Sequence, residues 1–563
     1  MSRVITPSIL ILLHCLGVIS GHIVDTLYGK VQGFDYSTAK GSTFNVFLGI
    51  PFAKAPVDSL RFEKPVPPFS WEGIKETKKF GPQCVPLQRD GIVFETSEDC
   101  LFLNVIKPST FKEGGYPVLV WVSYGVGTAS FYNYKTLAEN FVDQGIVVVT
   151  INYRLAVFGF GSSGDEDFKG NYGYFDQALA FKFVNENIAA FNGNASDVTA
   201  FGLSAGSASV GALSVSPYSR NYISKIIAMS GSALSNWAIG ENVVGSTKEL
   251  GSALNCTTNL KECLRTKSIK QILDSSQLIG TALDDMSLLK FKPRFDGDFF
   301  PKPVSELIKE SKKIPVYTGF TDQEGSFFTI LGLTKSINNI YVEPSHFNQF
   351  NESTFLDMIK KLVVTSDRYG KNCDKVTDKI LKFYTKHGNN APKDHIFYLN
   401  AYTQLASDLT ISVGSLWEAE LRSNNDWPVF LYKNTYFNPI YFSDPKIGVG
   451  LNVGATHGNE YPYMFNFNIF GTFTWSNEDH LFSKYLTTSI GNFVKTGNPS
   501  TDETKWENMG KETKFMELQS YPKMSSHLLQ EQSQFWKQLR DEFGYDVVTD
   551  TVHKISKKNS EEL

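Results

Sequence analysis

The sequence predicts an α/β protein built on a large, mostly parallel central sheet flanked by helices. Unbroken apolar runs at residues 117–122 and 145–151 are typical of strands that are buried on both faces. Between residues 175 and 192 the apolar side chains recur at helical spacing, so we expect a helix there. Strands that alternate with helices favour a parallel sheet, because parallel neighbours need a crossover connection.

Later segments continue this alternation. A strand-like stretch at residues 198–201 precedes small residues suited to the start of a close-packed helix, and further apolar runs follow at residues 223–229, 314–320 and 428–432. A late amphipathic helix is expected near residues 479–495. Its apolar face would consist of Phe482, Leu486, Ile490 and Phe493.

The composition is that of a globular protein with a large core, since 42% of the 563 residues are hydrophobic and 20% are charged. Lys and Arg number 54 against 58 Asp and Glu, which gives a net charge of −4. Because there is no basic excess, charge gives no argument for nucleic acid as a partner.

The chain is expected to begin with a secretory signal peptide over residues 1–21. Arg3 supplies a positive charge, and residues 9–19 form an apolar stretch that ends in small residues. That stretch is too short for a membrane span, so a membrane anchor is the less favoured alternative. The rest of the sequence predicts one domain over residues 22–545 and a polar tail over residues 546–563.

The cysteines fit an oxidising compartment. Cys84 and Cys100 are spaced to close a medium loop, Cys256 and Cys263 are spaced to close a tight one, and Cys373 is left over. Glycosylation sequons agree with passage through the secretory pathway. They lie at Asn194, Asn255 and Asn351.

A nucleophile-elbow pattern, G-x-S-x-G, stands at residues 202–206 as Gly-Leu-Ser-Ala-Gly. Such an elbow places a serine, here Ser204, on a sharp turn between a strand and a helix, where close backbone packing leaves no room for a Cβ on the flanking glycines. About one chain in five of this length would contain the pattern by chance. The serine therefore needs partners elsewhere in the chain before it indicates a function.

A serine hydroxyl becomes a good nucleophile when a base removes its proton and an acid orients that base. Of the histidines after Ser204, His457 differs from the rest because it lies in a glycine-flanked loop able to project an imidazole. The acid is expected after the strand at 314–320, where Asp322 and Glu324 are both eligible from the pattern.

Six stretches resemble the type-B carboxylesterase/cholinesterase family, in order and with that family's spacing, over nearly the whole chain. They are SEDCLFLNV (97–105), INYRLAVFGF (151–160), NYGYFDQALA (171–180), FGLSAGSASVGAL (201–213), TDQEGSFF (321–328) and GATHGNEYPYMF (454–465). The resemblance implies an α/β-hydrolase fold. It also implies a carboxylic ester hydrolase that needs no cofactor and no metal and acts on a small-molecule or lipid ester.

The resemblance assigns roles to the candidate residues. It implies Ser204 as nucleophile, Glu324 as orienting acid and His457 as general base and acid, so that Asp322 becomes a turn residue.

The resemblance also concerns residues around these three. Trp237 would line the pocket for the acyl group. The Ser230 hydroxyl would be a hydrogen-bond partner in the layer of residues that supports the three site residues. It pairs Cys84 with Cys100 and Cys256 with Cys263, and it implies ion pairs that join Arg61 to Glu98 and Arg154 to Asp176.

The oxyanion hole is where the sequence departs from the family. The family pattern has three glycines after the strand at 117–122, and here Tyr124 replaces the first, Gly125 remains and Val126 replaces the third. With the N–H of Ala205, Gly125 and Val126 would donate to the oxyanion. A β-branched residue resists the conformations that glycine permits, and loss of one donor costs about 3–4 kcal/mol, so a slowed esterase is expected.

Two functions compete. The first is a secreted or endoplasmic-reticulum lumenal ester hydrolase, and the second is a catalytically silent, esterase-like binding or adhesion protein, which the broken glycine run would suit. The complete set of Ser204, Glu324 and His457 and the lack of a second apolar span favour the hydrolase. The last four residues, SEEL, resemble a lumenal retention signal, so secretion and retention stay open.

Overall fold

A computed structural model describes residues 22–85, 96–123, 133–280, 282–283, 285–332, 338–386, 392–438, 451–466 and 474–553. The expected signal peptide, Gly125, Val126 and the end of the predicted tail lie outside these residues.

An eleven-stranded sheet forms the centre of the described part of the chain, in the order β16-β15-β14-β13-β12-β11-β9-β10-β8-β4-β3. Its strands are β3 (Phe34–Ser37), β4 (Thr43–Pro51), β8 (Phe102–Pro108), β9 (Tyr116–Val122), β10 (Val147–Ile151), β11 (Gly193–Leu203), β12 (Lys225–Met229), β13 (Val316–Thr321), β14 (Val429–Asn434), β15 (Phe515–Leu518) and β16 (Lys523–Ser525). Neighbours from β10 to β15 pair in parallel, and antiparallel strands lie at both edges. The expected large, mostly parallel sheet is confirmed.

Small sheets lie outside the central one. One pairs β1 (Ile23–Thr26), β2 (Gly29–Gln32) and β5 (Ile74–Glu76), a second pairs β6 (Gln83–Cys84) with β7 (Thr96–Ser97), and a third pairs β17 (Tyr545–Asp546) with β18 (Thr551–Val552).

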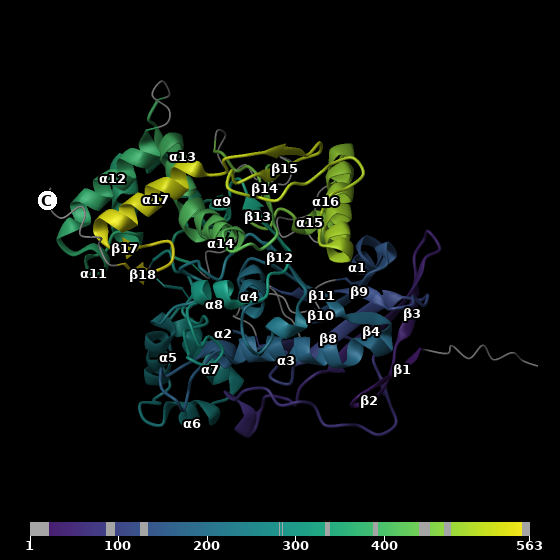
Figure 1. The fold of residues 1–563 in the computed structure, drawn as a ribbon. Coiled ribbons are helices and arrows are strands. Elements are labelled where there is room, and N and C mark those ends of the chain that lie inside the picture. Colours follow the sequence, from purple (N-terminus) through teal and green to yellow (C-terminus); the bar gives the residue numbers. More distant parts are fainter. Residues whose placement is uncertain are drawn as a thin grey trace, which may run out of the picture.

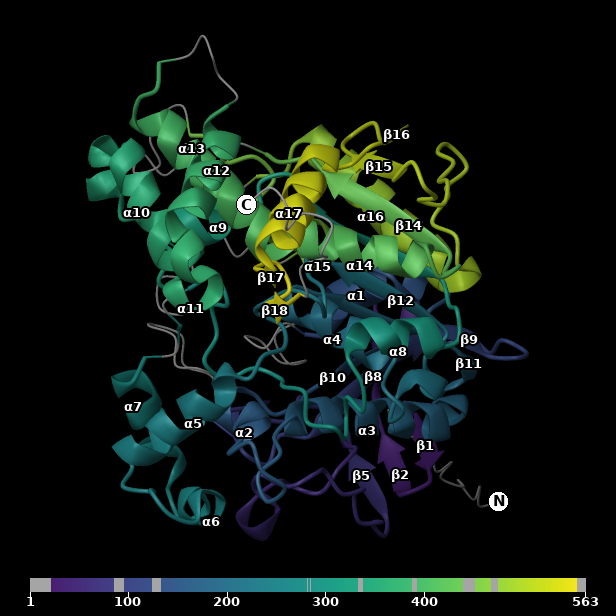
Figure 2. The same cartoon turned by 60° about the vertical axis from the view of Figure 1, so that its left-hand side comes forward.

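Helices cover both faces of the sheet (Figures 1 and 2). The α-helices are α1 (Tyr134–Asn140), α2 (Ala156–Phe160), α3 (Tyr172–Asn187), α4 (Ala205–Leu213), α5 (Asn242–Ala253), α6 (Leu260–Arg265), α7 (Ile269–Leu278), α8 (Val304–Glu310), α9 (Ser326–Thr329), α10 (Glu352–Leu362), α11 (Ser366–Tyr369), α12 (Cys373–Thr385), α13 (His395–Ser407), α14 (Val413–Ser423), α15 (Tyr461–Phe465), α16 (Asn477–Thr496) and α17 (Gln530–Phe543). A π-helical turn, η8 (Asp408–Ser412), joins α13 to α14. Short 3₁₀ turns are η1 (Asp58–Leu60), η3 (Val142–Gln144), η4 (Ile188–Phe191), η5 (Arg220–Tyr222), η6 (Pro344–Gln349) and η7 (Gly370–Asn372).

Strand β9 shows why the predicted strands are unbroken apolar runs. Successive side chains of a strand point to opposite faces of the sheet. Val118 and Val120 pack in the core shared with α3, α4 and α14, whereas Leu119 and Trp121 pack in the core shared with α1 and α16. All four side chains are fully buried, so neither face of the strand tolerates polar residues.

The late amphipathic helix is confirmed as α16. A capping box formed by Ser476 and Asp479 begins it, and Gly497, with a φ of 77°, ends it. Its predicted apolar face is fully buried against the sheet.

The C-terminal boundary of the folded body differs from the expected one at residue 545. Tyr545 and Asp546 pair with Val552 and Thr551 in the hairpin of β17 and β18. Between the strands the hydrophobic side chains of Val547 and Val548 are buried, so the body extends at least to residue 553. The sequence beyond Tyr545 contains too few apolar residues for its pattern to reveal this packing.

Candidate active site

Ser204 lies at the turn between β11 and α4. Its backbone has φ 60° and ψ −124°, a positive-φ conformation that residues with a side chain rarely adopt. A Cβ on Gly202 would overlap the carbonyl of Gly206, and a Cβ on Gly206 would overlap the carbonyl of Val122, so the turn requires both glycines. The Ser204 N–H donates to the Met229 carbonyl at 2.8 Å. This contact fixes the turn against β12, and the serine itself stays half-buried and open to a small reactant.

His457 lies between Ser204 and Glu324 in one hydrogen-bonded chain. Its Nε2 is 2.9 Å from Ser204 Oγ, and its Nδ1 is 2.6 Å from Glu324 Oε2. Glu324 is fully buried, and its Oε1 accepts from the Thr321 N–H at 2.7 Å. When Glu324 is ionised, Nδ1 donates its proton to the carboxylate, and Nε2 is then the acceptor for the Ser204 hydroxyl.

The loops that carry Glu324 and His457 are joined along their backbones. The Gln323 N–H donates to the Ala455 carbonyl, and the Ala455 N–H donates to Asp322 Oδ1, each at 2.9 Å. Asp322 was the second candidate for the acid in the sequence. In the structure its carboxylate binds the backbone two residues before His457, and Glu324 is the carboxylate in contact with the imidazole.

A pair of hydroxyl groups joins the same two loops. Ser326 Oγ lies 2.6 Å from Thr456 Oγ1 and 2.7 Å from the Gln323 carbonyl, and both hydroxyl-bearing residues are buried. Ser326 and Thr456 were not among the predicted site residues, although both lie inside the quoted motifs. Their contacts join segments about 130 positions apart, which single-sequence patterns do not reveal.

Two carboxyl groups beside the candidate residues have raised pKa values. Burial raises the pKa of Asp322 to about 6. Burial, together with the charge of Glu324, raises the pKa of Glu460 to about 8. The Tyr432 hydroxyl donates a long hydrogen bond of 3.4 Å to Glu460 Oε1, which favours the ionised carboxylate. The complete burial of Glu460 and the charge of Glu324 outweigh this bond, so they favour the neutral carboxyl near pH ~7.

One of the expected oxyanion donors lies in the described part of the chain. Ala205 is the first residue of α4, where backbone N–H groups point out of the helix. Gly125 and Val126 lie outside the described residues. Their loop follows β9, whose last residue, Val122, packs directly against Gly206 of the elbow.

The structure places Trp237 and Ser230 on the segment that follows β12. Trp237 is buried, and its indole N–H donates to the Thr410 carbonyl of η8. The hydrogen bond expected of the Ser230 side chain is not formed: this hydroxyl has no partner among the described residues. The backbone of Ser230, with a φ of 51°, instead donates its N–H to the Gly319 carbonyl of β13.

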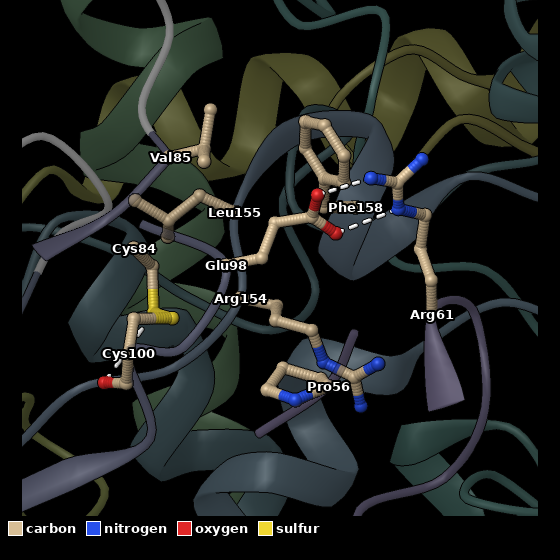
Figure 3. Close-up of a pocket in the computed structure, with 9 residues that line it drawn as sticks. All are labelled: Pro56, Arg61, Cys84, Val85, Glu98, Cys100, Arg154, Leu155 and Phe158. Atoms are coloured by element: carbon tan, nitrogen blue, oxygen red, sulfur yellow. Dashed lines mark hydrogen bonds and ion pairs between the residues drawn. A yellow bond between two sulfur atoms is a disulfide. The ribbon is translucent and has the colours of Figure 1, made fainter. Parts of the chain in front are cut away.

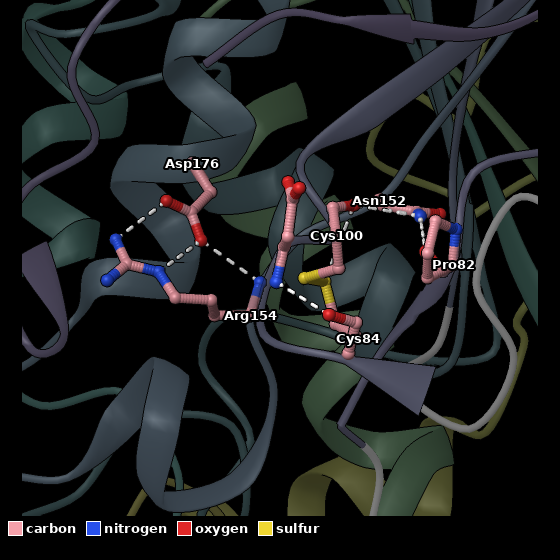
Figure 4. The surroundings of a disulfide bond; sticks show 8 residues. Pro82, Cys84, Cys100, Asn152, Arg154 and Asp176 are labelled. Carbon is pink, nitrogen blue, oxygen red and sulfur yellow. Dashed lines mark hydrogen bonds and ion pairs between the residues drawn. A yellow bond between two sulfur atoms is a disulfide. The ribbon is translucent and has the colours of Figure 1, made fainter. Parts of the chain in front are cut away.

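Both expected disulfides are confirmed, Cys84–Cys100 and Cys256–Cys263, and Cys373 carries a free thiol. Figure 4 shows the first disulfide beside Asn152, whose amide donates to the Cys100 carbonyl at 2.9 Å.

The two implied ion pairs are also present. Arg61 binds Glu98, with Nε 2.7 Å from Oε2, and Arg154 binds the fully buried Asp176 through two bonds of 2.8 Å. Figure 3 shows that Arg61, Glu98 and Arg154 line a small pocket beside the Cys84–Cys100 disulfide. Because Ser204, His457 and Glu324 do not line this pocket, it is separate from the candidate site.

The sequon residues differ in exposure. Asn255 and Asn351 are exposed, whereas Asn194 is half-buried in β11. Within the described ranges no helix combines the length and the apolar character that a membrane span needs. The same ranges contain no group of three or more His, Cys, Asp or Glu side chains placed to hold a metal ion.

The chain matches known proteins over almost its whole length. The Carboxylesterase family profile matches residues 20–536. The chain is similar to gut esterase 1 of Caenorhabditis briggsae, with 37% identity over 99% of both chains, and to gut esterase 1 of Caenorhabditis elegans, with 36% identity over the full length of both. It is also similar to carboxylesterase 4A of Bos taurus, with 29% identity over 92% of this chain and 94% of the relative.

The chain therefore belongs to the Carboxylesterase family. Membership confirms the α/β-hydrolase fold, and together with the esterase-named relatives it supports carboxylic ester hydrolysis with small-molecule esters as substrates.

Proposed function

We propose that this chain is a serine carboxylesterase in which Ser204 is the nucleophile, His457 the general base and acid, and Glu324 the orienting acid. The observation that carries the proposal is the hydrogen-bonded chain from Ser204 Oγ through His457 to Glu324, with distances of 2.9 and 2.6 Å. A serine on a strained turn, a buried carboxylate and an imidazole between them are what acyl transfer requires.

The reaction proceeds in two acyl transfers. Ser204 Oγ attacks the ester carbonyl carbon while His457 Nε2 takes the hydroxyl proton, and Glu324 stabilises the imidazolium that forms. His457 then gives this proton to the departing alcohol, which leaves an acyl group on Ser204. A water molecule repeats the sequence: His457 takes one of its protons, the hydroxide adds to the acyl carbon, and Ser204 leaves with the proton as the free acid is released.

The oxyanion of each tetrahedral intermediate would be stabilised by the N–H of Ala205 and by the loop of Gly125 and Val126. Ala205 begins α4, so the positive end of the helix faces this charge. Valine resists positive φ and adds bulk near the substrate carbonyl, and we infer that Val126 slows the enzyme.

Labelling with a fluorophosphonate, together with turnover of a simple aryl ester, tests the proposal. The wild type should be labelled and should hydrolyse the ester, and Ser204→Ala should do neither. If the wild type is neither labelled nor active and Ser204→Ala behaves identically, the chain is instead an esterase-like binding protein. The broken glycine run is the observation that favours that second function.

The oxyanion loop has its own test. Val126→Gly should raise turnover of the aryl ester by more than about tenfold, because it restores a donor conformation worth 10²–10³ in rate. A Val126→Ala variant, which removes bulk but keeps a Cβ, separates the steric effect from the conformational one. Equal rates in the wild type and Val126→Gly would show that the loop already donates in full.

We also infer that the protein enters the secretory pathway and is secreted or retained in the lumen of the endoplasmic reticulum. The predicted signal peptide at residues 1–21, the two disulfides and the sequons at Asn194, Asn255 and Asn351 support this inference. Deletion of the last four residues separates the two destinations: if SEEL is a retention signal, the truncated protein leaves the cell and the full chain does not.

A further inference from the structure

The π-helical turn η8 and helix α14 present a stripe of four positions spaced four residues apart. Residues four apart lie on one face of a helix. We name Thr410, Gly414, Glu418 and Arg422 the η8–α14 stripe. Helix α14 packs against strands β13 and β14 and helices α8 and α17 (Figure 2).

The first three positions of the stripe contact the segment of residues 232–237, which follows β12. The Thr410 carbonyl accepts the indole N–H of Trp237. Glu418 Oε2 accepts from the Ser232 hydroxyl at 2.6 Å and from the Ala233 N–H at 2.9 Å. Both ends of the segment are therefore held by hydrogen bonds from one continuous helical element.

Gly414 lies between Thr410 and Glu418 on the stripe. Because it has no Cβ, the segment of residues 232–237 can approach the helix closely at this position. A Cβ at position 414 would lie 2.5 Å from Ser235 Oγ and 3.5 Å from the Cα and Cβ of Ser235. The first distance is shorter than real Cβ contacts, whereas the others are ordinary contacts. Ser235 is 2% exposed, and its hydroxyl has no hydrogen-bond partner among the described residues, so this hydroxyl contributes bulk alone.

The last position of the stripe reaches the helix of the nucleophile. Arg422 Nη2 donates to the Gly211 carbonyl and to Ser214 Oγ at the end of α4, each at 3.1 Å. The same guanidinium binds Glu418 Oε1, with Nη2 2.8 Å away. One buried ion pair therefore joins α4 to the segment that Glu418 holds.

This segment also begins in contact with the elbow. Ser207 Oγ, on α4, donates to the Gly231 carbonyl at 2.7 Å, and a Cβ on Gly231 would overlap the Ser204 carbonyl. Strand β12 ends beside Ser204, at the carboxyl edge of the sheet where α/β proteins bind their substrates. The segment at 232–237 therefore begins directly after a contact with the elbow that carries Ser204.

We propose that the η8–α14 stripe positions the acyl-side wall of the site, so that Gly414 and Glu418 are positioning residues that determine which acyl chains fit. This inference rests on the proposed esterase function, with the acyl group bound against the segment that ends at Trp237. A shift of the segment changes the room for the acyl chain, and it leaves the binding of the alcohol portion unchanged.

Variants at position 414 test the proposal, with kcat/KM measured for aryl esters of a short and a long acyl chain. Gly414→Val should change the ratio of the two values by about fivefold or more, since one methylene in a pocket is worth roughly 10–200-fold. Gly414→Ala should change it in the same direction by less. Ser235→Ala, which removes the closest atom, should return the Gly414→Ala ratio to that of the wild type.

Two controls separate positioning from a general loss of structure. Ser415→Ala alters the next residue of α14, whose buried hydroxyl also has no partner among the described residues, and should keep the wild-type ratio. A series of esters with one acyl chain and different alcohols should keep its order in every variant. If Gly414→Val does not fold, Gly414→Ala and its Ser235→Ala double variant decide the question.

An unchanged acyl ratio in folded, labelled Gly414 variants would overturn the inference, and so would an equal change in the alcohol series. These outcomes leave the proposed function intact, because the wild type and the variants would still hydrolyse esters. A wild type that neither labels nor turns over an ester contradicts the proposed function instead.

Discussion

The backbone of Ser204 stores strain at the place where the chemistry is proposed. A non-glycine residue with a φ of 60° and a ψ of −124° costs about 1–3 kcal/mol, and surrounding contacts must hold it there. The hydrogen bond to Met229 and the two flanking glycines provide these contacts. In this conformation Ser204 Oγ lies 2.9 Å from His457 Nε2.

The role of Glu324 can be separated from that of Asp322 by a substitution that removes the charge of Glu324 and keeps the shape of its side chain. Glu324→Gln keeps an oxygen for the Thr321 N–H, but it cannot stabilise the imidazolium of His457 or fix its tautomer. We expect kcat for an aryl ester to fall by about 10³–10⁴, as when the acid of a catalytic triad becomes an amide. Steady-state kinetics at saturating ester measures this loss.

Asp322→Asn is the matched control for that loss. The asparagine side chain keeps an oxygen for the Ala455 N–H, so kcat should stay within about threefold of the wild type. Equal losses in the two variants would contradict the assignment of separate roles to the two carboxylates.

At the residue scale, short patterns only nominated candidates for the site. G-x-S-x-G pointed to Ser204 and a glycine-flanked loop pointed to His457, but each pattern alone was weak, and the family resemblance was needed to favour both residues and to choose Glu324 over Asp322. The side chain of Ser230 was expected to form a hydrogen bond, and it does not among the described residues. Such a bond depends on distances between strands, which no local pattern contains.

At the scale of elements, the site depends on two loops that are joined to each other. Strand β13 leads into the loop of Glu324, and the loop of His457 precedes α15. An isolated bridge between Gln323 and Thr456 pairs these loops in parallel, and the hydroxyls of Ser326 and Thr456 meet across it. The distance from His457 to Glu324 is therefore set by loop pairing as well as by the two side chains.

Ser326→Ala tests this coupling. The variant removes the buried hydrogen-bond partner of the Thr456 hydroxyl, which lowers the free energy of unfolding by about 1–3 kcal/mol. It also loosens the loop that carries His457. We expect kcat to fall by about tenfold while KM changes little, because Ser326 is fully buried and acts on the reaction only through the position of His457. Pre-steady-state release of the alcohol would show that the loss lies in acylation.

Ser311→Ala controls for the loss of a buried serine hydroxyl. Ser311 follows α8, is buried and donates to the Leu307 carbonyl at 2.7 Å, in the same way that Ser326 donates to a backbone carbonyl. Its kcat should match the wild type. A similar loss in both variants would assign the effect of Ser326→Ala to stability rather than to the position of His457.

The strands and long helices were predictable from the sequence because burial on two faces leaves a strong pattern. Strand β9 spans Tyr116–Val122 where residues 117–122 were expected, and α16 spans Asn477–Thr496 where residues 479–495 were expected. The hairpin of β17 and β18 was missed because it has few apolar residues and depends on contacts such as that between the Asn236 N–H and the Val548 carbonyl. The pairing of the two site loops was not predicted either, because it depends on contacts between segments that are far apart in the sequence.

At the scale of the whole molecule, burial of carboxyl groups links stability to pH. Burial raises the pKa of Asp408 in η8 to about 7, and it raises that of Glu460 to about 8. Both groups bind protons more tightly in the folded state than in an unfolded chain. The folded protein therefore gains stability from them in acid and loses it as the pH rises.

Glu460→Gln isolates one of these contributions. A glutamate in an unfolded chain titrates near pH ~4.3, so between this value and about 8 the native protein holds a proton that the unfolded chain has released. The free energy of unfolding of the wild type falls across that window and levels above it, whereas glutamine, which mimics the neutral carboxyl, has no such dependence.

The difference between the apparent Tm of the variant and that of the wild type should therefore increase by about 2–4 °C in favour of the variant from about pH 5 to about pH 8. Thermal unfolding at one scan rate measures the difference, and Glu113→Gln, at an exposed carboxylate, controls for the loss of one charge. Parallel Tm curves for Glu460→Gln and the wild type would mean that Glu460 is ionised in the folded protein.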